Sequence, residues 1–535
     1  MKNIFKLLLM CIALLAVSAC TNLDETLVGE VGSQFNGEEP DFATFNGGGA
    51  GPSDAVSSAF NQLRESGSAN HGGYFGVQSV STDEMAVTQK GGDWYDGGIW
   101  LDIHTHSYGP SNGPIRDTWG AQYAAIGVCN TALGAGDLDA NQTAQVKALR
   151  AFFYYRLLDL YGRVKIVTEA GGDVPQSSRA QVFNFVENEL LDALGIANVV
   201  GMDLSTSPLV TAQTPYRINQ FAALGLLAKL YLNAEVYTGT ARYAEASAAA
   251  GYVVDNGGYV LCSDGCSVPN EGKRPNVASD PDILEGYAAV FAPNNQDNPE
   301  IIWSIAYDNV SGPNMNFAQM TLHYSSQFTW NLQEQPWNGY SALEDFYNSY
   351  DSADKRKTAN FIVGPQSDYE GSVILDYAGT GGDLILDYTV DINELEPNAS
   401  RKGGARLGKF SFRQGQRNDM DNDYPIIRLG DMYLIRAEAD ARVAGDWNVA
   451  LTDVNTIRAR ADVPALTSLT ADEFLAERGR EMFMEVTRRQ DLIRFGKYND
   501  SWWEKTASAP FRNVFPIPQE QIDASNGTLT QNPGY

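Results

Sequence analysis

Residues 423–461 read DYPIIRLGDMYLIRAEADARVAGDWNVALTDVNTIRARA, and this stretch decides the fold. Apolar residues recur at helical spacing over positions 429–439, and Gly445 interrupts the run. A second run with the same spacing covers residues 451–461, and Pro464 follows just beyond its end. The stretch therefore predicts two helices joined as a hairpin.

A third helix is predicted where the chain continues TADEFLAERGREMFMEVTRRQDLIRFGK, at residues 470–497. Thr470 and Glu473 have the spacing of a capping box, in which each side chain accepts the other residue's backbone amide. We therefore expect the helix to begin directly after Thr470 and to continue to residue 497.

These segments resemble the C-terminal half of the SusD/RagB proteins, on the text YPIIRLGDMYLIRAEA, VNTIRARA and ERGREMFMEVTRRQDLIRFGK. FPIP at 515–518, QNPGY at 531–535 and ALRAFFYYRLLDLYGRV at 148–164 are similar to the family as well. Members of this family are surface lipoproteins of Bacteroidetes. They pass glycans to a SusC-type TonB-dependent transporter in the outer membrane.

The resemblance implies a mainly α, SusD-like fold, with tetratricopeptide-like helical hairpins backing a loop-rich lobe that carries a few short β-hairpins. It implies an N-terminal region at 53–330 and a C-terminal region at 331–535. It implies non-catalytic glycan capture in polysaccharide utilisation, a SusC-type transporter as partner, and no cofactor. It also favours internal ion pairs over a recognition surface for the charged residues of 470–497, which include Arg478, Arg480, Glu481, Glu485, Arg488, Arg489, Asp491 and Arg494.

Length and charge narrow the classes of protein and partner. The chain has 535 residues, enough for one large core or for two to three lobes. Its formal net charge of −28 argues against nucleic acid, because binding phosphates needs a basic face. The same charge and the low lysine content favour a neutral glucan over an anionic substrate.

The N-terminus has the pattern of an exported lipoprotein. A basic start and an apolar run at residues 7–17, too short to span a bilayer, are followed by Val-Ser-Ala and Cys20. This ending resembles a bacterial lipobox, so residues 1–19 are predicted to be a signal peptide and Cys20 the lipidated residue. Residues 20–52 would form the tether to an outer-membrane, cell-surface location. The alternative is an ordinary signal peptide in which Cys20 has no role.

Three cysteines remain after Cys20. Cys262 and Cys266 lie four residues apart in a short loop and could form a disulfide outside the cytoplasm. A zinc site is less favoured, because two ligands are too few. Cys129 falls on the apolar face of a predicted helix and is expected to be a buried thiol.

Helical periodicity recurs along the first half of the chain, and the second half is more irregular. Residues 79–110 are dense in aromatic and polar residues without a helical period, and 255–423 indicate loops, short helices and a few β-hairpins. Helices are predicted at 53–65, 119–133, 143–161, 179–194, 217–237 and 241–254.

Two aromatic clusters on loops are candidates for glycan binding, since sugar C–H faces pack on aromatic rings and sugar hydroxyls need polar partners. The first contains Trp94, Tyr95, Trp100, His104 and Tyr108, and the second Tyr324, Trp330, Trp337 and Tyr340. For the first cluster a scaffold role is equally supported. For Trp330, Trp337 and Tyr340 exposure at the surface is favoured. The resemblance implies a binding face drawn from both parts of the chain.

Catalytic and metal-binding motifs are weak in this sequence. Glycosidases need two carboxylates at a fixed separation, and no sequence context singles out a pair. A glycoside hydrolase and a non-glycan helical scaffold therefore stay open as alternatives. His104 and His106 lack a third ligand, and the acidic run Asp419, Asp421 and Asp423 lacks the glycine and glutamate of an EF-hand, so no metal site is predicted.

Overall fold

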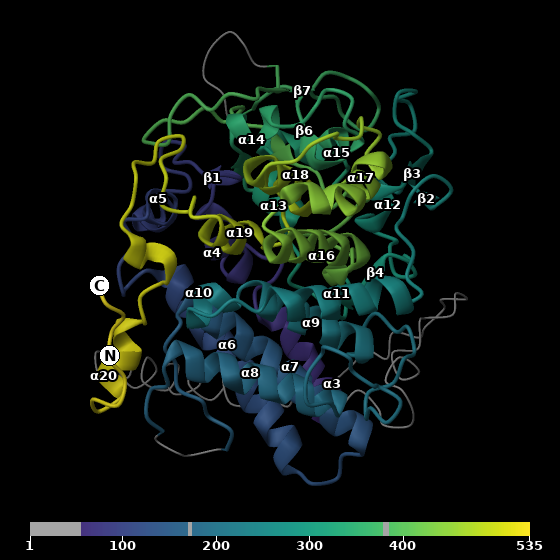
Figure 1. The fold of residues 1–535 in the computed structure, drawn as a ribbon. Helices are drawn as coiled ribbons and strands as arrows, with labels where there is room; N and C mark the ends of the chain where they lie inside the picture. Colours follow the sequence, from purple (N-terminus) through teal and green to yellow (C-terminus); the bar gives the residue numbers. More distant parts are fainter. Residues whose placement is uncertain (1–54, 170–173, 378–384) are drawn as a thin grey trace, which may run out of the picture. The chain divides into compact units, whose positions relative to one another are not determined.

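The computed structural model describes residues 55–169, 174–377 and 385–535 (Figure 1). The predicted signal peptide, Cys20 and the tether lie outside the described residues. No helix within the described ranges is long and apolar enough to cross a membrane.

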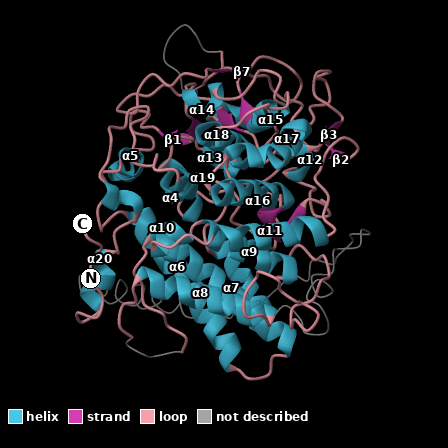
Figure 2. Cartoon of the chain, in the orientation of Figure 1, coloured by secondary structure: helices cyan, strands magenta, loops and turns pink. Residues whose placement is uncertain are grey.

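Helices dominate the described chain, and the larger ones gather in the lower half of the view in Figure 2. They pack in chain order, α6 on α7, α7 on α8, α8 on α9 and α9 on α11, and α11 then packs on α16 from the C-terminal part. The mainly α fold class is confirmed. The bounds are α3 (Ala55–Glu65), α6 (Gly113–Gly134), α7 (Ala140–Leu160), α8 (Arg179–Leu194), α9 (Gln220–Leu232), α10 (Ala234–Thr238), α11 (Tyr243–Asn256) and α16 (Leu429–Ala444).

Local sequence signals explain where these helices begin and end. Capping boxes at Asp139 and Ser178 start α7 and α8. Gly195 and Gly445 end α8 and α16 in the left-handed conformation, which glycine adopts without steric cost. The helix predicted at 179–194 is confirmed at both ends.

The C-terminal helices differ from the prediction in one place. The hairpin of α16, η3 (Trp447–Ala450) and α17 (Leu451–Arg460) is confirmed, and so is the Thr470 capping box at the start of α18 (Ala471–Met482). The single helix predicted at 470–497 is wrong, because α18 stops and α19 (Arg488–Arg494) begins anew. Met484 and Val486 between them have φ of 61° and 55°, outside the helical region.

A buried lysine explains this break. Lys409 Nζ donates hydrogen bonds to the carbonyl oxygens of Glu481, at 3.1 Å, and Phe483, at 2.7 Å. These carbonyls are therefore bound to a side chain from another segment instead of to the amides of a further helical turn. The long-range contact outweighs the local helical preference.

Short antiparallel strand pairs hold the loop-rich part together, each sheet among the described residues having two strands. Most pairs join segments far apart in sequence, so the prediction of hairpins holds only loosely. The pairs are β1 (Met85–Val87) with β5 (Tyr340–Ala342), β2 (Ser267–Pro269) with β3 (Ile283–Glu285), β4 (Ile301–Ile305) with β10 (Tyr424–Arg428), β6 (Phe361–Ile362) with β9 (Arg406–Leu407), and β7 (Gly364–Pro365) with β8 (Asp387–Tyr388).

Short helices complete the loop-rich part. One of them, α5 (Ile99–Thr105), lies inside the segment 79–110, where the sequence predicted loops, and α4 (Tyr74–Val80) ends at the start of that segment. Each has seven residues, which make only two turns, too few to establish a period. These helices are α4 (Tyr74–Val80), η1 (Asp96–Gly98), α5 (Ile99–Thr105), α12 (Tyr287–Val290), α13 (Phe317–Thr321), η2 (Tyr324–Phe328), α14 (Glu344–Asn348), α15 (Lys355–Asn360), η4 (Pro510–Asn513) and α20 (Gln519–Ala524). The predicted boundary at residue 330 stays a prediction.

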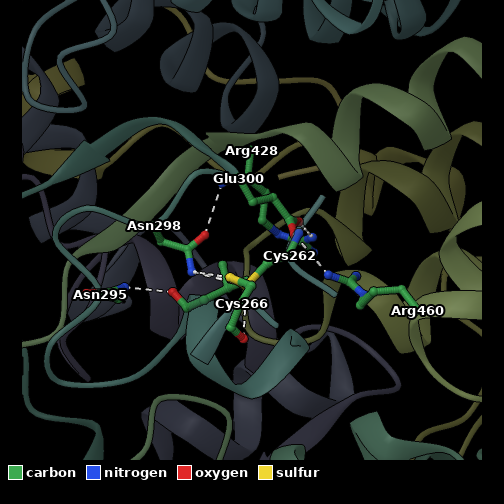
Figure 3. The surroundings of a disulfide bond; sticks show 8 residues. Cys262, Cys266, Asn295, Asn298, Glu300, Arg428 and Arg460 are labelled. Atoms are coloured by element: carbon green, nitrogen blue, oxygen red, sulfur yellow. Dashed lines mark hydrogen bonds and ion pairs between the residues drawn. A yellow bond between two sulfur atoms is a disulfide. The ribbon is translucent and has the colours of Figure 1, made fainter. Parts of the chain in front are cut away.

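A buried ionic cluster joins α17 and α18 to β10, beside the disulfide drawn in Figure 3. Arg428 pairs with Glu300 at 2.8 Å and with Glu481 at 2.7 Å, and Arg460 pairs with Glu300 at 3.0 Å. Most charged side chains of 470–497 are buried in such pairs, so the internal interpretation is confirmed.

The predicted disulfide is present, and Cys129 is a buried free thiol as expected. The backbone amide of Cys262 donates to Glu300 Oε2 at 3.0 Å, and Asn298 lies against both sulfur atoms (Figure 3). The short loop that the disulfide closes therefore supplies one of the hydrogen bonds that hold Glu300 in the ionic cluster.

Candidate functional site

An open hollow of about 510 Å³, here called the first hollow, forms where two distant segments meet. Aromatic rings, two carboxylates and an amide line it together. The lining residues are His71, Asp93, Trp94, Asp96, Tyr324, Gln335, Pro336 and Trp337. Trp94 and Trp337 belong to the two aromatic clusters that were predicted separately from the sequence, and the fold brings these two segments together.

Strand pairing places these two segments side by side. β1 pairs with β5 so that Val87 lies opposite Tyr340, which sets the chain after β1 against the chain before β5. Lys90, buried in this junction, donates from Nζ to the carbonyl oxygen of Gly339 at 3.2 Å. The first hollow thus depends on contacts across some 250 positions of sequence, as the separation of Lys90 and Gly339 shows.

Trp94 is fixed in place by the opposite segment. Its indole Nε1–H donates to the carbonyl oxygen of Trp337 at 2.6 Å. Its ring meets Tyr340 edge-on at 5.9 Å between centroids, and its backbone has a φ of 60°. Gly339 lies so close that an added Cβ would stand 2.3 Å from the Trp94 ring. The indole is therefore held on one side and only half-buried on the other.

Trp337 and Tyr324 complete the aromatic wall. The Trp337 amide donates to the carbonyl oxygen of Gln319 at 2.7 Å, which anchors its backbone. The Tyr324 hydroxyl donates to the Asp93 carboxylate, and burial together with this carboxylate raises the pKa of Tyr324 to about 12. Both rings are partly exposed, so each presents a surface to a ligand.

His71 lies between the two indoles, edge-on to Trp337 at 5.1 Å and to Trp94 at 6.1 Å. Burial lowers its pKa, so the ring is neutral near pH 7. Its Nδ1 is buried and makes no hydrogen bond within the described chain.

Comparison with known proteins is consistent with this fold. The sequence model of the SusD family matches residues 287–510. The starch-binding protein SusD of Bacteroides thetaiotaomicron is 27% identical over 452 residues, which cover 74% of this chain and 73% of that protein. The chain is therefore similar to SusD proteins over about three quarters of its length, and residues 287–510 match the SusD family.

Further members and solved structures extend the likeness. The SusD-like protein P25 of Formosa agariphila is 22% identical over 79% of this chain and 80% of its own length. A laminarin-binding SusD-like protein has a TM-score of 0.66 at 21% identity, covering 90% of this chain and 98% of its own. Surface glycan-binding protein A from Bacteroides thetaiotaomicron, solved with laminarihexaose, has a TM-score of 0.64 at 19% identity, covering 89% and 98%. These structures confirm the SusD-like fold.

Three predicted site residues meet at the first hollow, namely Trp94, Tyr324 and Trp337. Tyr95 is exposed but does not line it. Trp330 is half-buried and lines a different hollow. His71, Asp93, Asp96, Gln335 and Pro336 also line the first hollow and were not predicted; Asp93 and Asp96 flank Trp94 and Tyr95 in sequence, which was the available signal.

Four other aromatic residues of the two clusters are buried and cannot stack on a ligand. Exposure of Tyr340 was predicted and is wrong, since its ring is enclosed beneath Trp94 and its hydroxyl donates to the carbonyl oxygen of His71 at 3.0 Å. Trp100, His104 and Tyr108 are buried as well. Trp100 and His104 lie on the buried side of α5, and Tyr108 follows it.

The two groups that were weighed as metal ligands, and not predicted to be a site, have protein partners. His104 Nε2 bonds the carbonyl oxygen of Trp503 at 2.9 Å, and burial lowers its pKa to about 4. Asp419, Asp421 and Asp423 turn to different partners: the Asn314 amide, the Arg413 guanidinium and the Tyr216 hydroxyl respectively. Within the described ranges no group of three or more His, Cys, Asp or Glu side chains is arranged to hold a metal ion.

Proposed function

We propose that this chain is a non-catalytic binding protein that holds a neutral glucan in the first hollow. The observation that carries the proposal is the pair Trp94 and Trp337, two partly exposed indoles of one hollow, linked by the hydrogen bond from Trp94 Nε1 to the Trp337 carbonyl. Apolar C–H faces of sugar rings pack on such indoles with little loss of side-chain entropy, because tryptophan has few rotatable bonds.

The polar lining supports a hydroxyl-rich, uncharged ligand. Asp93, Asp96 and the Gln335 amide can accept or donate hydrogen bonds to sugar hydroxyls. The lining has two carboxylates and no lysine or arginine, so an anionic glycan would be repelled. Starch and laminarihexaose, named for two similar proteins, are both neutral glucans.

The binding proposal is tested by Trp337→Ala and Trp94→Ala in affinity electrophoresis on amylopectin and laminarin. Base stacking on an aromatic ring, a related geometry, is worth about 1–3 kcal/mol. We expect each substitution to weaken binding about tenfold, which corresponds to about 1.4 kcal/mol. Phe328→Ala, an exposed aromatic that does not line the first hollow, is the matched control and should bind as the wild type does.

The proposal is wrong for this hollow if both tryptophan variants keep wild-type retardation on a glucan that retards the wild type. A lowered melting temperature with unchanged binding would mean that the rings only stabilise the fold. A wild type retarded by neither polysaccharide would contradict a neutral glucan.

The proposal includes lipid anchoring at Cys20 and delivery to a SusC-type transporter in the outer membrane. Wild-type protein should fractionate with membranes and label with a fatty acid, whereas Cys20→Ala should not. Detergent extracts should yield a complex with a large β-barrel, through an interface of over about 2,000 Å². Equal membrane retention of both proteins would contradict the anchor, and recovery of this protein alone would contradict the partner.

A glycoside hydrolase is the second candidate, favoured by the presence of Asp93 and Asp96 in one hollow. Glycosidases use two carboxylates, one of them as a general acid. Here Asp93 accepts the Tyr324 hydroxyl and Asp96 accepts the Trp100 indole N–H at 3.2 Å, so each carboxylate has a fixed protein partner. Prolonged incubation with amylopectin and laminarin should release no reducing ends. If the wild type releases reducing ends and Asp93→Asn does not, the protein is a glycoside hydrolase instead.

A further inference from the structure

A second hollow, of about 400 Å³, lies beside the segment that carries Trp330. Its walls combine one indole and one phenyl ring with aliphatic side chains and hydroxyls. The residues that line it include Thr329, Trp330, Ile362, Pro365, Ser411 and Phe412. None of them lines the first hollow, so the two hollows are separate.

Two hydroxyls in this second hollow have no partner. Thr329 is only 2% exposed, and its Oγ1 makes no hydrogen bond in the described part of the chain. The Ser411 Oγ atom is likewise buried and unpaired there. Buried polar groups in folded proteins are nearly always hydrogen-bonded to protein or to ordered water, so these two hydroxyls can each accept or donate a bond to a molecule that enters the hollow.

The charged residues of the second hollow are neutralised within the protein. Arg274 pairs with Asp280 at 2.8 Å and donates to the Ser367 hydroxyl at 2.6 Å. Lys409 pairs with Glu485 at 2.5 Å. These three, Arg274, Asp280 and Lys409, are the charged residues among those that line the hollow, so an ionic ligand would find no free counter-charge there.

Trp330 supplies an apolar surface next to the free hydroxyls. Its ring packs edge-on against Phe412, with centroids 5.1 Å apart and an interplanar angle of 88°. Its carbonyl accepts the Gly415 amide at 2.8 Å, which fixes the backbone. The indole is only half-buried, so part of it stays available.

We propose that the second hollow is a further carbohydrate-binding subsite, in which a neutral sugar unit packs on Trp330 and hydrogen-bonds Thr329 and Ser411. The inference rests on the proposed function and adds a second contact point for the same glycan. Residues 330 to 337 connect the two hollows, and seven residue steps span at most about 25 Å. The two tryptophans are therefore no farther apart than a glucan chain of several units can span, and binding of one chain at both would favour polymers over short oligosaccharides.

The test compares Trp330→Ala and Thr329→Val with Trp337→Ala, using titration calorimetry with maltohexaose and laminarihexaose and affinity electrophoresis on amylopectin and laminarin. Trp330→Ala and Thr329→Val are expected to weaken polysaccharide binding threefold or more. Trp337→Ala is expected to weaken binding of both the hexasaccharide and the polysaccharide. The Trp330 indole and the Thr329 hydroxyl are changed in separate variants, so the test still gives a result if one of these variants fails to fold.

Melting temperature separates a binding role from a structural one. Thr329→Val removes an unpaired hydroxyl, so its melting temperature should equal or exceed that of the wild type. Thr118→Val is the matched control: its buried hydroxyl donates to the Pro114 carbonyl at 2.8 Å, so loss of that bond should lower the melting temperature and leave binding unchanged.

The pattern of binding across the three variants shows which of the two proposals fails. Loss of binding in Trp337→Ala with wild-type binding in both Trp330→Ala and Thr329→Val overturns the second subsite and keeps the first hollow. Loss of binding in Trp330→Ala and Thr329→Val with wild-type binding in Trp337→Ala overturns the proposed function of the first hollow and supports the second. Wild-type binding in all three overturns both.

Discussion

Gly339→Ala should damage the first hollow without removing any atom from it. A Cβ at this position would stand 2.3, 2.5 and 2.7 Å from three carbon atoms of the Trp94 ring. Carbon atoms in contact normally lie about 3.5–4.0 Å apart, so one group must move by about 1 Å or more. The backbone is held on both sides, since the Gly339 amide donates to the Met320 carbonyl and the Gly339 carbonyl accepts Lys90 Nζ. The Trp94 ring is therefore the part that moves.

The size of the effect follows from what Trp94 loses. The hydrogen bond from its Nε1 to the Trp337 carbonyl contributes about 1 kcal/mol, and the edge-on contact with Tyr340 about 0.5–1.5 kcal/mol. Overpacking of this kind costs about 1–3 kcal/mol in total, so the free energy of unfolding should fall by about that amount. A displaced indole no longer lies at its place beside Trp337 in the first hollow, and glucan binding should weaken about tenfold or more.

The assay is affinity electrophoresis of Gly339→Ala on the glucan that retards the wild type, with urea unfolding alongside. The matched control is Gly92→Ala in the segment that faces Gly339, where an added Cβ meets nothing within 4 Å. The control should bind and unfold as the wild type does. Wild-type retardation by Gly339→Ala would refute the reasoning, because it would show that the position of the Trp94 ring does not matter to the ligand.

Three further predictions concern stability. Burial raises the pKa of Asp423 to about 7, against an ordinary value of about 3.9, so the folded state keeps a proton that the unfolded state releases. Wild-type stability should therefore fall as the pH rises from about 4 to about 7, and urea unfolding of Asp423→Asn should lack this loss; parallel pH profiles would contradict the shift. Arg428→Ala removes one arginine partner from each of three buried glutamates and should cost about 3–5 kcal/mol in guanidinium unfolding, whereas Arg116→Ala, in an exposed pair, should cost under about 1 kcal/mol. The double variant Cys262→Ser, Cys266→Ser should lose about 2 kcal/mol in urea unfolding and keep glucan binding, since neither cysteine lines a hollow. A reductant should lower the free energy of unfolding of the wild type but not that of this variant.

The helical part of the fold could be predicted because its signals are local. The capping box at Thr470 and the left-handed glycine at Gly445 lie within a few residues of the helix ends that they set. The break after Met482 could not be predicted in the same way. It depends on Lys409, which lies far away in sequence and binds the carbonyls at the end of α18.

The site could be predicted only in part, because composition selects aromatic residues but does not say which of them reach the surface. Trp94 and Trp100 lie six residues apart and both qualify by type, yet the second is buried on α5. Trp330 and Trp337 lie on one segment and line different hollows. What separates the members of each pair is the pairing of β1 with β5 and the packing of Phe412, and both are long-range contacts.

The long-range pairing also explains how the first hollow can bind without being rebuilt for each ligand. The Trp94 indole N–H is hydrogen-bonded to the backbone carbonyl of Trp337, and the Trp337 amide in turn donates to the carbonyl of Gln319. Ordering two indoles in one hollow costs conformational entropy, and here the cost falls on folding instead of on binding. A weak contact such as a sugar face on an indole then contributes almost its full value to affinity. Disturbing the ring position through Gly339 is accordingly expected to matter as much to the ligand as deleting a ring.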